Sequence, residues 1–190
     1  MGIRPLKRAV FLDRDGVLNE AVIRDGKPYP PDSAAEVEIV AGASAALHRL
    51  KALGLPLIVV TNQPDVGRGK QTIEAVEAIH ERLRSELPVD DFLSCFHDDA
   101  DRCGCRKPLP GLILEGAARH EADLGRSFMV GDRWRDIDAG RAAGCRTIWI
   151  DSGYRERGPS EPPDAKVASL NEAVQWIVQQ IQAEEHGTER

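Results

Sequence analysis

The chain has no long apolar run. No stretch of its 190 residues approaches ~18 consecutive apolar residues, the rough minimum for a helix that crosses a bilayer. The first apolar run stops at Asp13 after a few residues, which is too short for the core of a signal peptide. We therefore expect a cytoplasmic protein with no membrane partner.

An excess of positive charge is also missing. The 25 Lys and Arg residues are outnumbered by 31 Asp and Glu residues, which gives a formal net charge of −6. General affinity for nucleic acids comes mainly from clustered Lys and Arg that contact the phosphate backbone. The composition therefore argues against a nucleic-acid partner.

Cysteine is scarce, and three of the four cysteines lie within residues 95–105. Cytoplasmic thiols stay reduced, so close Cys and His spacing favours a metal site over a disulfide. Cys95-x-His97 and Cys103-x-Cys105 offer the four N and S ligands that suit tetrahedral Zn²⁺. Four protein ligands leave no position for water or substrate, which predicts a structural zinc loop. The alternative, buried cysteines beside a surface histidine, fits this polar, turn-rich segment poorly.

Short β-branched runs alternate with amphipathic helical patterns along the chain. We expect strands at 8–13, 56–61, 91–96, 127–132 and 145–151, and helices at 41–54, 71–83, 110–121, 134–143 and from 169 to about 183. This alternation predicts an α/β fold, a Rossmann-like parallel sheet with helices on both faces and function at the strand C-termini. The length suits one domain over residues 1–183, a monomer, followed by a disordered tail at 184–190.

Two carboxylates, Asp13 and Asp15, follow the first expected strand, and Gly16 allows the sharp turn after them. Their spacing lets both side chains point into one pocket. The alternative is a turn-capping Asp-x-Asp-Gly with no catalytic role, and the motif alone does not decide between the two.

Other expected strands and connections end in polar residues too. These are Thr61-Asn62-Gln63, then Arg106-Lys107, then Gly131-Asp132. The order DxD, Thr, Lys, then an acidic motif resembles the haloacid-dehalogenase (HAD) superfamily of phosphotransferases, over residues 11–140. The resemblance implies an enzyme, a phosphoric monoester hydrolase, with an aspartyl-phosphate intermediate.

The resemblance assigns a role to each motif. Asp13 would attack phosphorus, and Asp15 would protonate the leaving oxygen and then activate water. Thr61 would hold the phosphoryl oxygens, and Lys107 would neutralise their charge.

The resemblance also implies a catalytic Mg²⁺, a hard cation that prefers oxygen ligands. Asp13, the Asp15 carbonyl and Asp132 would bind it, with Asp136 as a further ligand or as support for one. The alternative for Asp132 and Asp136 is charge at a helix N-terminus, which contributes only ~0.3–1 kcal/mol.

The segment Cys-x-His…Cys-x-Cys-Arg-Lys-Pro resembles the small capless phosphatases that act on D-glycero-D-manno-heptose 1,7-bisphosphate or on histidinol phosphate. The motif spacing leaves no room for a cap domain. The expected partner is a small phosphorylated metabolite, a sugar bisphosphate. The residues expected to bind it are Asn19, Asn62, Gln63, Arg106 and Arg133.

The RKPLPG and DRDGVLN segments favour the heptose-bisphosphate branch, which makes surface-glycan precursors. Histidinol phosphate stays open, because PDVGRG departs from the usual heptose-branch segment. Further alternatives are a polynucleotide 3′-phosphatase and a non-catalytic zinc-stabilised binding domain. Basic residues that could bind a second phosphate, or be solvated surface charge, are Arg68, Lys70, Arg133 and Arg135.

Overall fold

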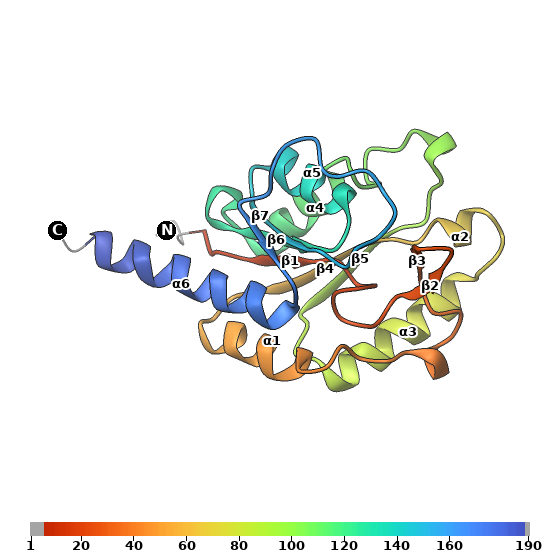
Figure 1. Ribbon diagram of the computed structural model, residues 1–190, viewed down its shortest axis with the longest axis horizontal. Helices are drawn as coiled ribbons and strands as arrows, with labels where there is room; N and C mark the ends of the chain where they lie inside the picture. The colour runs from red at the N-terminus through yellow and green to blue at the C-terminus, as the bar shows by residue number, and fades with distance from the viewer. Residues whose placement is uncertain (1–5, 189–190) are drawn as a thin grey trace.

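A six-stranded parallel sheet forms the centre of the computed structural model, which describes residues 6–188 (Figure 1). The strand order is β5-β4-β1-β6-β7-β8. The strands are β1 (Val10–Leu12), β4 (Leu57–Asn62), β5 (Asp91–Cys95), β6 (Phe128–Gly131), β7 (Arg146–Ile150) and β8 (Ala165–Val167). The expected parallel sheet is confirmed, with β1 between β4 and β6.

Helices cover both faces of the sheet because its strands are apolar on both sides. In β1, Val10 and Leu12 belong to one core cluster and Phe11 to the other. One face carries α1 (Ala43–Ala52), α3 (Ile73–Glu86) and α6 (Leu170–Thr188), and the other carries α4 (Gly111–His120) and α5 (Trp134–Ala143) (Figure 1). The short elements are α2 (Pro64–Gly67) and the 3₁₀ turns η1 (Ala34–Glu36), η2 (Asp99–Asp101) and η3 (Leu124–Arg126).

Two features were not expected from the sequence. The sixth strand, β8, pairs in parallel with β7 at the edge of the sheet. A two-stranded hairpin, β2 (Val22–Arg24) and β3 (Lys27–Tyr29), follows the first motif. Each of these strands has only three residues, and the hairpin strands have no buried residue, so no apolar alternation marked them.

The expected tail at 184–190 is wrong for residues 184–188, which continue α6. Glu184 forms ion pairs with Arg8 and Arg146, and these pairs hold the end of α6 against the sheet. Residues 189–190, like residues 1–5, lie outside the described part. Within residues 6–188, no helix is both long and apolar enough to cross a membrane.

Gly140→Ala should destabilise the protein by about 1–3 kcal/mol, because α5 packs too closely on the sheet to accommodate a methyl group. A Cβ at Gly140 would lie 2.6 Å from Met129 Cβ and 2.9 Å from Thr147 Cγ2. Urea unfolding measures the change. The matched control is Gly125→Ala, whose Cβ would meet only Asp123 Oδ1 at 3.5 Å. Equal stability of the two variants would contradict this account of the packing.

Candidate active site

The predicted motifs meet at the carboxyl edge of the sheet. Asp13 follows β1, Thr61 lies in β4, and Lys107 comes from the loop after β5. All three line a cavity of about 250 Å³, together with Asp15 and Asp136. Parallel strands end at the same edge, which explains how motifs far apart in the chain come together.

Lys107 is the buried cation of this site, with a side chain that is only 2% exposed. Its Nζ lies 2.9 Å from Asp13 Oδ1 and 2.5 Å from Asp136 Oδ1, and it donates to the Val60 carbonyl at 2.7 Å. Burial alone would lower the pKa of Lys107, but the two carboxylates raise it above its usual value. Lys107 is therefore charged at neutral pH.

Three buried carboxylates share the site with this single ammonium, and two of them, Asp13 and Asp136, contact it. Burial and the neighbouring Asp136 raise the pKa of Asp13 to about 6, and burial and Asp13 raise the pKa of Asp132 well above its usual value. One ligand oxygen from each of Asp13, Asp132 and Asp136 lies within 4.8 Å of the others. Asp132 Oδ1 is buried and has no hydrogen-bond partner among residues 6–188. The uncompensated charge and the unpaired oxygen fit a hard divalent cation such as Mg²⁺.

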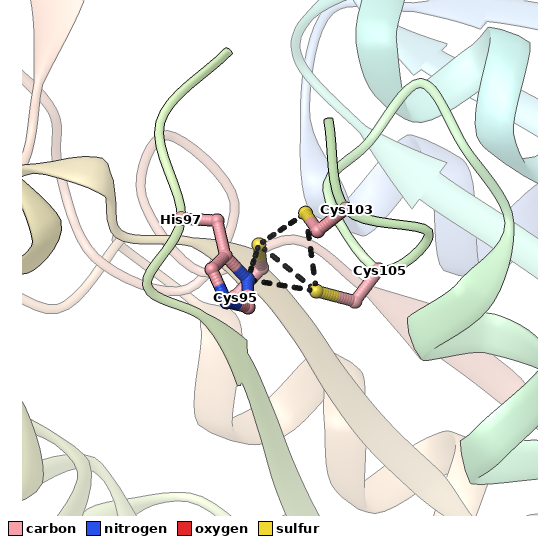
Figure 2. A group of neighbouring side chains, drawn as sticks. All are labelled: Cys95, His97, Cys103 and Cys105. Atoms are coloured by element: carbon pink, nitrogen blue, oxygen red, sulfur yellow. Dashed lines mark hydrogen bonds between the residues drawn. The ribbon is translucent and has the colours of Figure 1, made fainter. Parts of the chain in front are cut away.

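The cysteine segment also forms a candidate metal centre (Figure 2). The contacts among Cys95 Sγ, His97 Nδ1, Cys103 Sγ and Cys105 Sγ range from 3.2 to 3.7 Å. Ligands at ~2.3 Å from a tetrahedral centre would stand about 3.8 Å apart, so this cluster matches the size of a zinc site. The four side chains converge from the end of β5 and from the turn before Arg106 (Figure 2).

Comparisons with known proteins agree with this chemistry. An HAD-hydrolase-like family model matches residues 104–173. The D-glycero-alpha-D-manno-heptose-1,7-bisphosphate 7-phosphatase of Mycobacterium tuberculosis (strain CDC 1551 / Oshkosh) is 38% identical, over 74% of this chain and 78% of that protein. This chain belongs to that family of HAD-type phosphatases. It is thus an enzyme, a phosphoric monoester hydrolase.

Two further relatives resemble this phosphatase over nearly its full length. The D-glycero-beta-D-manno-heptose-1,7-bisphosphate 7-phosphatase of Helicobacter pylori (strain J99 / ATCC 700824) is 33% identical, over 90% of this chain and 97% of that protein. The D,D-heptose 1.7-bisphosphate phosphatase from B. bronchiseptica, solved with magnesium and phosphate, matches with a TM-score of 0.74 and 28% identity. That match covers 91% of this chain and 99% of the solved one.

Asp15 is held by four hydrogen-bond donors. Arg14 contacts both carboxylate oxygens, Asn19 Nδ2 donates to Oδ1 at 3.0 Å, and Gln63 Nε2 donates to Oδ2 at 2.8 Å. Burial alone would raise the pKa of Asp15, but the Arg14 guanidinium and these hydrogen bonds hold it below its usual value. Asp15 is therefore ionised in this state of the site.

Two of the five residues expected to bind substrate contact Asp15 instead of lining the cavity. Asn19 and Gln63 are buried and contact Asp15, and in the described part of the chain neither lines the cavity. The Asn62 amide forms two hydrogen bonds, of 2.9 and 3.0 Å, with the Lys107 backbone. Asn62, Arg106 and Arg133 do line the cavity.

Some functional candidates were missed from the sequence. Glu156 pairs with Arg133, and Tyr154 Oη donates to Asp132 Oδ2 at 2.7 Å. Both come from the turn-rich segment after β7, in which no local pattern singles them out. The hairpin contributes Lys27 to the cavity wall, and η2 contributes Asp99.

Gly16→Ala should reduce kcat/KM by roughly 100-fold, a loss typical of a misplaced active-site group. A Cβ at Gly16 would lie 1.8 Å from Asp132 Oδ2, so the carboxylate must move. Steady-state kinetics measure the effect. Gly42→Ala is the matched control, because Gly42 has a similar φ of +78° and, within residues 6–188, its added Cβ would meet no atom of a non-neighbouring residue within 4 Å. Both variants carry the same backbone strain, so equal activities would contradict the assigned close approach.

We expect about one zinc ion per chain, because the Cys/His cluster supplies four ligands. Cys105→Ala should lose the zinc and lower the melting temperature. Cys145→Ala removes a buried thiol outside the cluster and should retain zinc. Metal analysis of the purified variants checks this, and wild-type zinc content in Cys105→Ala would show that the site has been misidentified.

Proposed function

We propose that this phosphatase removes the 7-phosphate of D-glycero-D-manno-heptose 1,7-bisphosphate. The names of the relatives support this substrate, and they include both the alpha and the beta anomer, so we assign no anomeric preference. The structural observation that carries the proposal is the charge around the catalytic group. Apart from the catalytic residues, the charged residues that line the cavity are the cations Lys27, Arg68, Arg106, Arg133 and Arg135 and the carboxylates Asp65, Asp99 and Glu156.

Five cations against three carboxylates leave an excess of positive charge beyond the reacting phosphate. Arg106 lies closest in sequence to Lys107, and its Nη1 is buried without a partner among residues 6–188. Arginine suits bidentate contacts with phosphate oxygens. We propose that the five cavity cations, and Arg106 in particular, bind the distal 1-phosphate of the substrate. Lys70, which was expected to contribute, does not line this cavity in the described structure.

In the first proposed step, Asp13 attacks phosphorus. Lys107 and the Arg14 backbone N–H both contact Oδ1 of Asp13, so Oδ2 has no donor among residues 6–188. A bond forms between this carboxylate and phosphorus while the bond from phosphorus to the ester oxygen breaks. Asp15, which is ionised in the free site, takes up a proton from solvent as the substrate phosphate binds beside it, and gives that proton to the departing alkoxide.

In the second step, water attacks the phosphorus of the aspartyl phosphate. Asp15 takes a proton from that water, and the bond from phosphorus to the Asp13 carboxylate breaks. Thr61 and Lys107 hold the phosphoryl oxygens throughout. Mg²⁺, bound by Asp13, the Asp15 carbonyl and Asp132 with Asp136 nearby, would neutralise charge on the phosphoryl group.

We assign a structural role to zinc at the Cys/His cluster. The loop that carries the cluster continues directly into Arg106 and Lys107. A bound zinc would fix that loop and therefore the position of both cations.

Histidinol phosphate is the second candidate substrate. It would place an ammonium and an imidazole where the bisphosphate has its distal phosphate. Asp99 and Glu156, both on the cavity wall, are possible partners for such cations. Each is already paired with an arginine, Arg106 and Arg133 respectively, so a substrate cation would have to displace that arginine. The excess of cavity cations over carboxylates favours the anionic substrate.

A phosphate-release panel with Mg²⁺ tests the proposal. It contains both anomers of the heptose bisphosphate, histidinol phosphate and a 3′-phosphorylated oligonucleotide. We expect the highest kcat/KM for a heptose bisphosphate. Asp13→Asn serves as the control for contaminating phosphatases and should release no phosphate. A clear preference for histidinol phosphate or the oligonucleotide would overturn the substrate assignment.

Arg106→Ala should lower kcat/KM for the bisphosphate by roughly 100-fold, and far less for a simple monophosphate, because it removes a contact with the distal phosphate. Paired kinetics on the two substrates measure the difference. Equal losses would instead mean that Arg106 serves the transferred phosphoryl group.

A further inference from the structure

Arg14 is a buried cation that the proposed mechanism does not use. It lies between the two motif aspartates, its side chain is fully buried, and it is among the largest buried side chains of the described chain. Arginine is almost never fully buried unless it is paired, because removing its charge from water is costly. The partners of Arg14 therefore indicate why it is there.

The guanidinium makes a two-point contact with the acid–base carboxylate. Arg14 Nε donates to Asp15 Oδ1 at 3.1 Å, and Arg14 Nη2 donates to Asp15 Oδ2 at 3.0 Å. Two parallel charge-assisted hydrogen bonds fix the plane of a carboxylate as well as its position. The amides of Asn19 and Gln63 also donate to Asp15, but they are neutral and weaker donors.

The other end of the guanidinium is anchored to the fold. Arg14 Nη1 lies 3.3 Å from His80 Nε2, and the His80 ring stacks on Phe92 with centroids 4.6 Å apart. Burial, and then the charge of Arg14, lower the pKa of His80 to about 3, so the ring is neutral and Nε2 can accept this hydrogen bond. A continuous chain of contacts therefore runs from Phe92 in β5, through His80 in α3 and Arg14, to Asp15.

We propose that Arg14, braced by His80, is a positioning residue that orients the Asp15 carboxylate for proton transfer at the ester oxygen. The inference rests on the proposed role of Asp15. When the ester oxygen of the substrate approaches Asp15, it can replace the amide of Asn19 or Gln63 as a hydrogen-bond partner. The two-point contact with Arg14 then keeps the Asp15 carboxylate oriented toward that oxygen. Asp15 is 15% exposed as a side chain and lines the cavity, so the carboxylate is accessible to the substrate.

If Arg14 positions Asp15 for proton transfer, the effect of its loss should depend on whether the leaving group needs a proton. A primary alkoxide must receive a proton from Asp15 as the bond from phosphorus to the ester oxygen breaks, whereas a nitrophenolate departs as a stable anion without one. Because kcat/KM reports steps up to the first irreversible one, it isolates the attack by Asp13 from the later hydrolysis. Loss of positioning should thus affect alkyl esters and largely spare aryl esters.

The experiment compares kcat/KM for a primary alkyl phosphate and for p-nitrophenyl phosphate in Arg14→Gln and Arg14→Lys. We expect each variant to lose roughly 100-fold on the alkyl ester and less than about 5-fold on the aryl ester. Arg14→Lys keeps the charge but cannot make the two-point contact. Equal losses on the two esters, or wild-type kinetics in Arg14→Lys, would overturn the proposal. The ratio does not depend on the natural ester, so a wrong substrate assignment leaves it readable.

Arg8→Gln is the matched control. Arg8 is an 11% exposed side chain that pairs with Glu184, and it does not line the active-site cavity in the described structure. Arg8→Gln should lower stability and leave the alkyl-to-aryl ratio unchanged. A shifted ratio in this control would show that loss of any part-buried ion pair has the same effect, which would overturn the inference.

His80 provides a second route if the Arg14 variants fail to fold. His80→Leu removes the acceptor for Arg14 Nη1, whereas His80→Gln can supply a side-chain oxygen in its place. We expect His80→Leu to lower the alkyl-to-aryl ratio by about 10-fold and His80→Gln to restore most of it. A wild-type ratio in folded His80→Leu would contradict the bracing role.

Discussion

The buried ion pairs of Lys107 are the contact on which the active site depends. One ammonium, 2% exposed, touches Asp13 at the end of β1 and Asp136 at the start of α5. Removing one partner of such a buried pair typically costs about 3–5 kcal/mol, because the other charge stays buried and uncompensated. The same ammonium donates to Val60 in β4, so it connects three elements of the fold. The position of Lys107 therefore determines the geometry of the whole carboxyl edge.

Two devices hold Lys107 in that position. The Asn62 amide both donates to and accepts from the Lys107 backbone, which ties the residue to the end of β4. On the other side, the Cys/His cluster folds the preceding loop, and a Cβ at Gly111 would collide with the Gly104 carbonyl at 2.3 Å. The start of α4 thus packs directly on the cluster. This rigidity suits an open pocket, since no cap domain within residues 6–188 orders the catalytic groups by closing over them.

The sequence was sufficient to predict the sheet and the convergence of Asp13, Thr61 and Lys107, because parallel strands bring their carboxyl ends to one edge. It was not sufficient to separate residues that face substrate from those that support a catalytic group. Asn19 and Gln63 were expected to face substrate, but both are buried and support Asp15. Segments distant in the sequence bury them, and no local pattern predicts that burial. The hairpin, in contrast, had a usable signal that was overlooked: Asp25-Gly26, both with positive φ, is a favoured turn pair.

The cavity arginines are held in place by carboxylates before any substrate arrives. Arg106 pairs with Asp99, which is 55% exposed as a side chain, and Arg133 pairs with the less exposed Glu156. Ordering a free arginine side chain costs up to about 2 kcal/mol of conformational entropy. Because the ion pairs order Arg106 and Arg133 before substrate binds, that entropy is not lost on binding. A substrate phosphate that binds either arginine must displace its carboxylate partner. The displaced Asp99 can be solvated more easily than the displaced Glu156, because Asp99 is more exposed. Replacing the carboxylate by phosphate therefore costs less free energy at Arg106 than at Arg133. The charge pattern therefore favours the Arg106 side of the cavity as the place where an anionic group of the substrate binds.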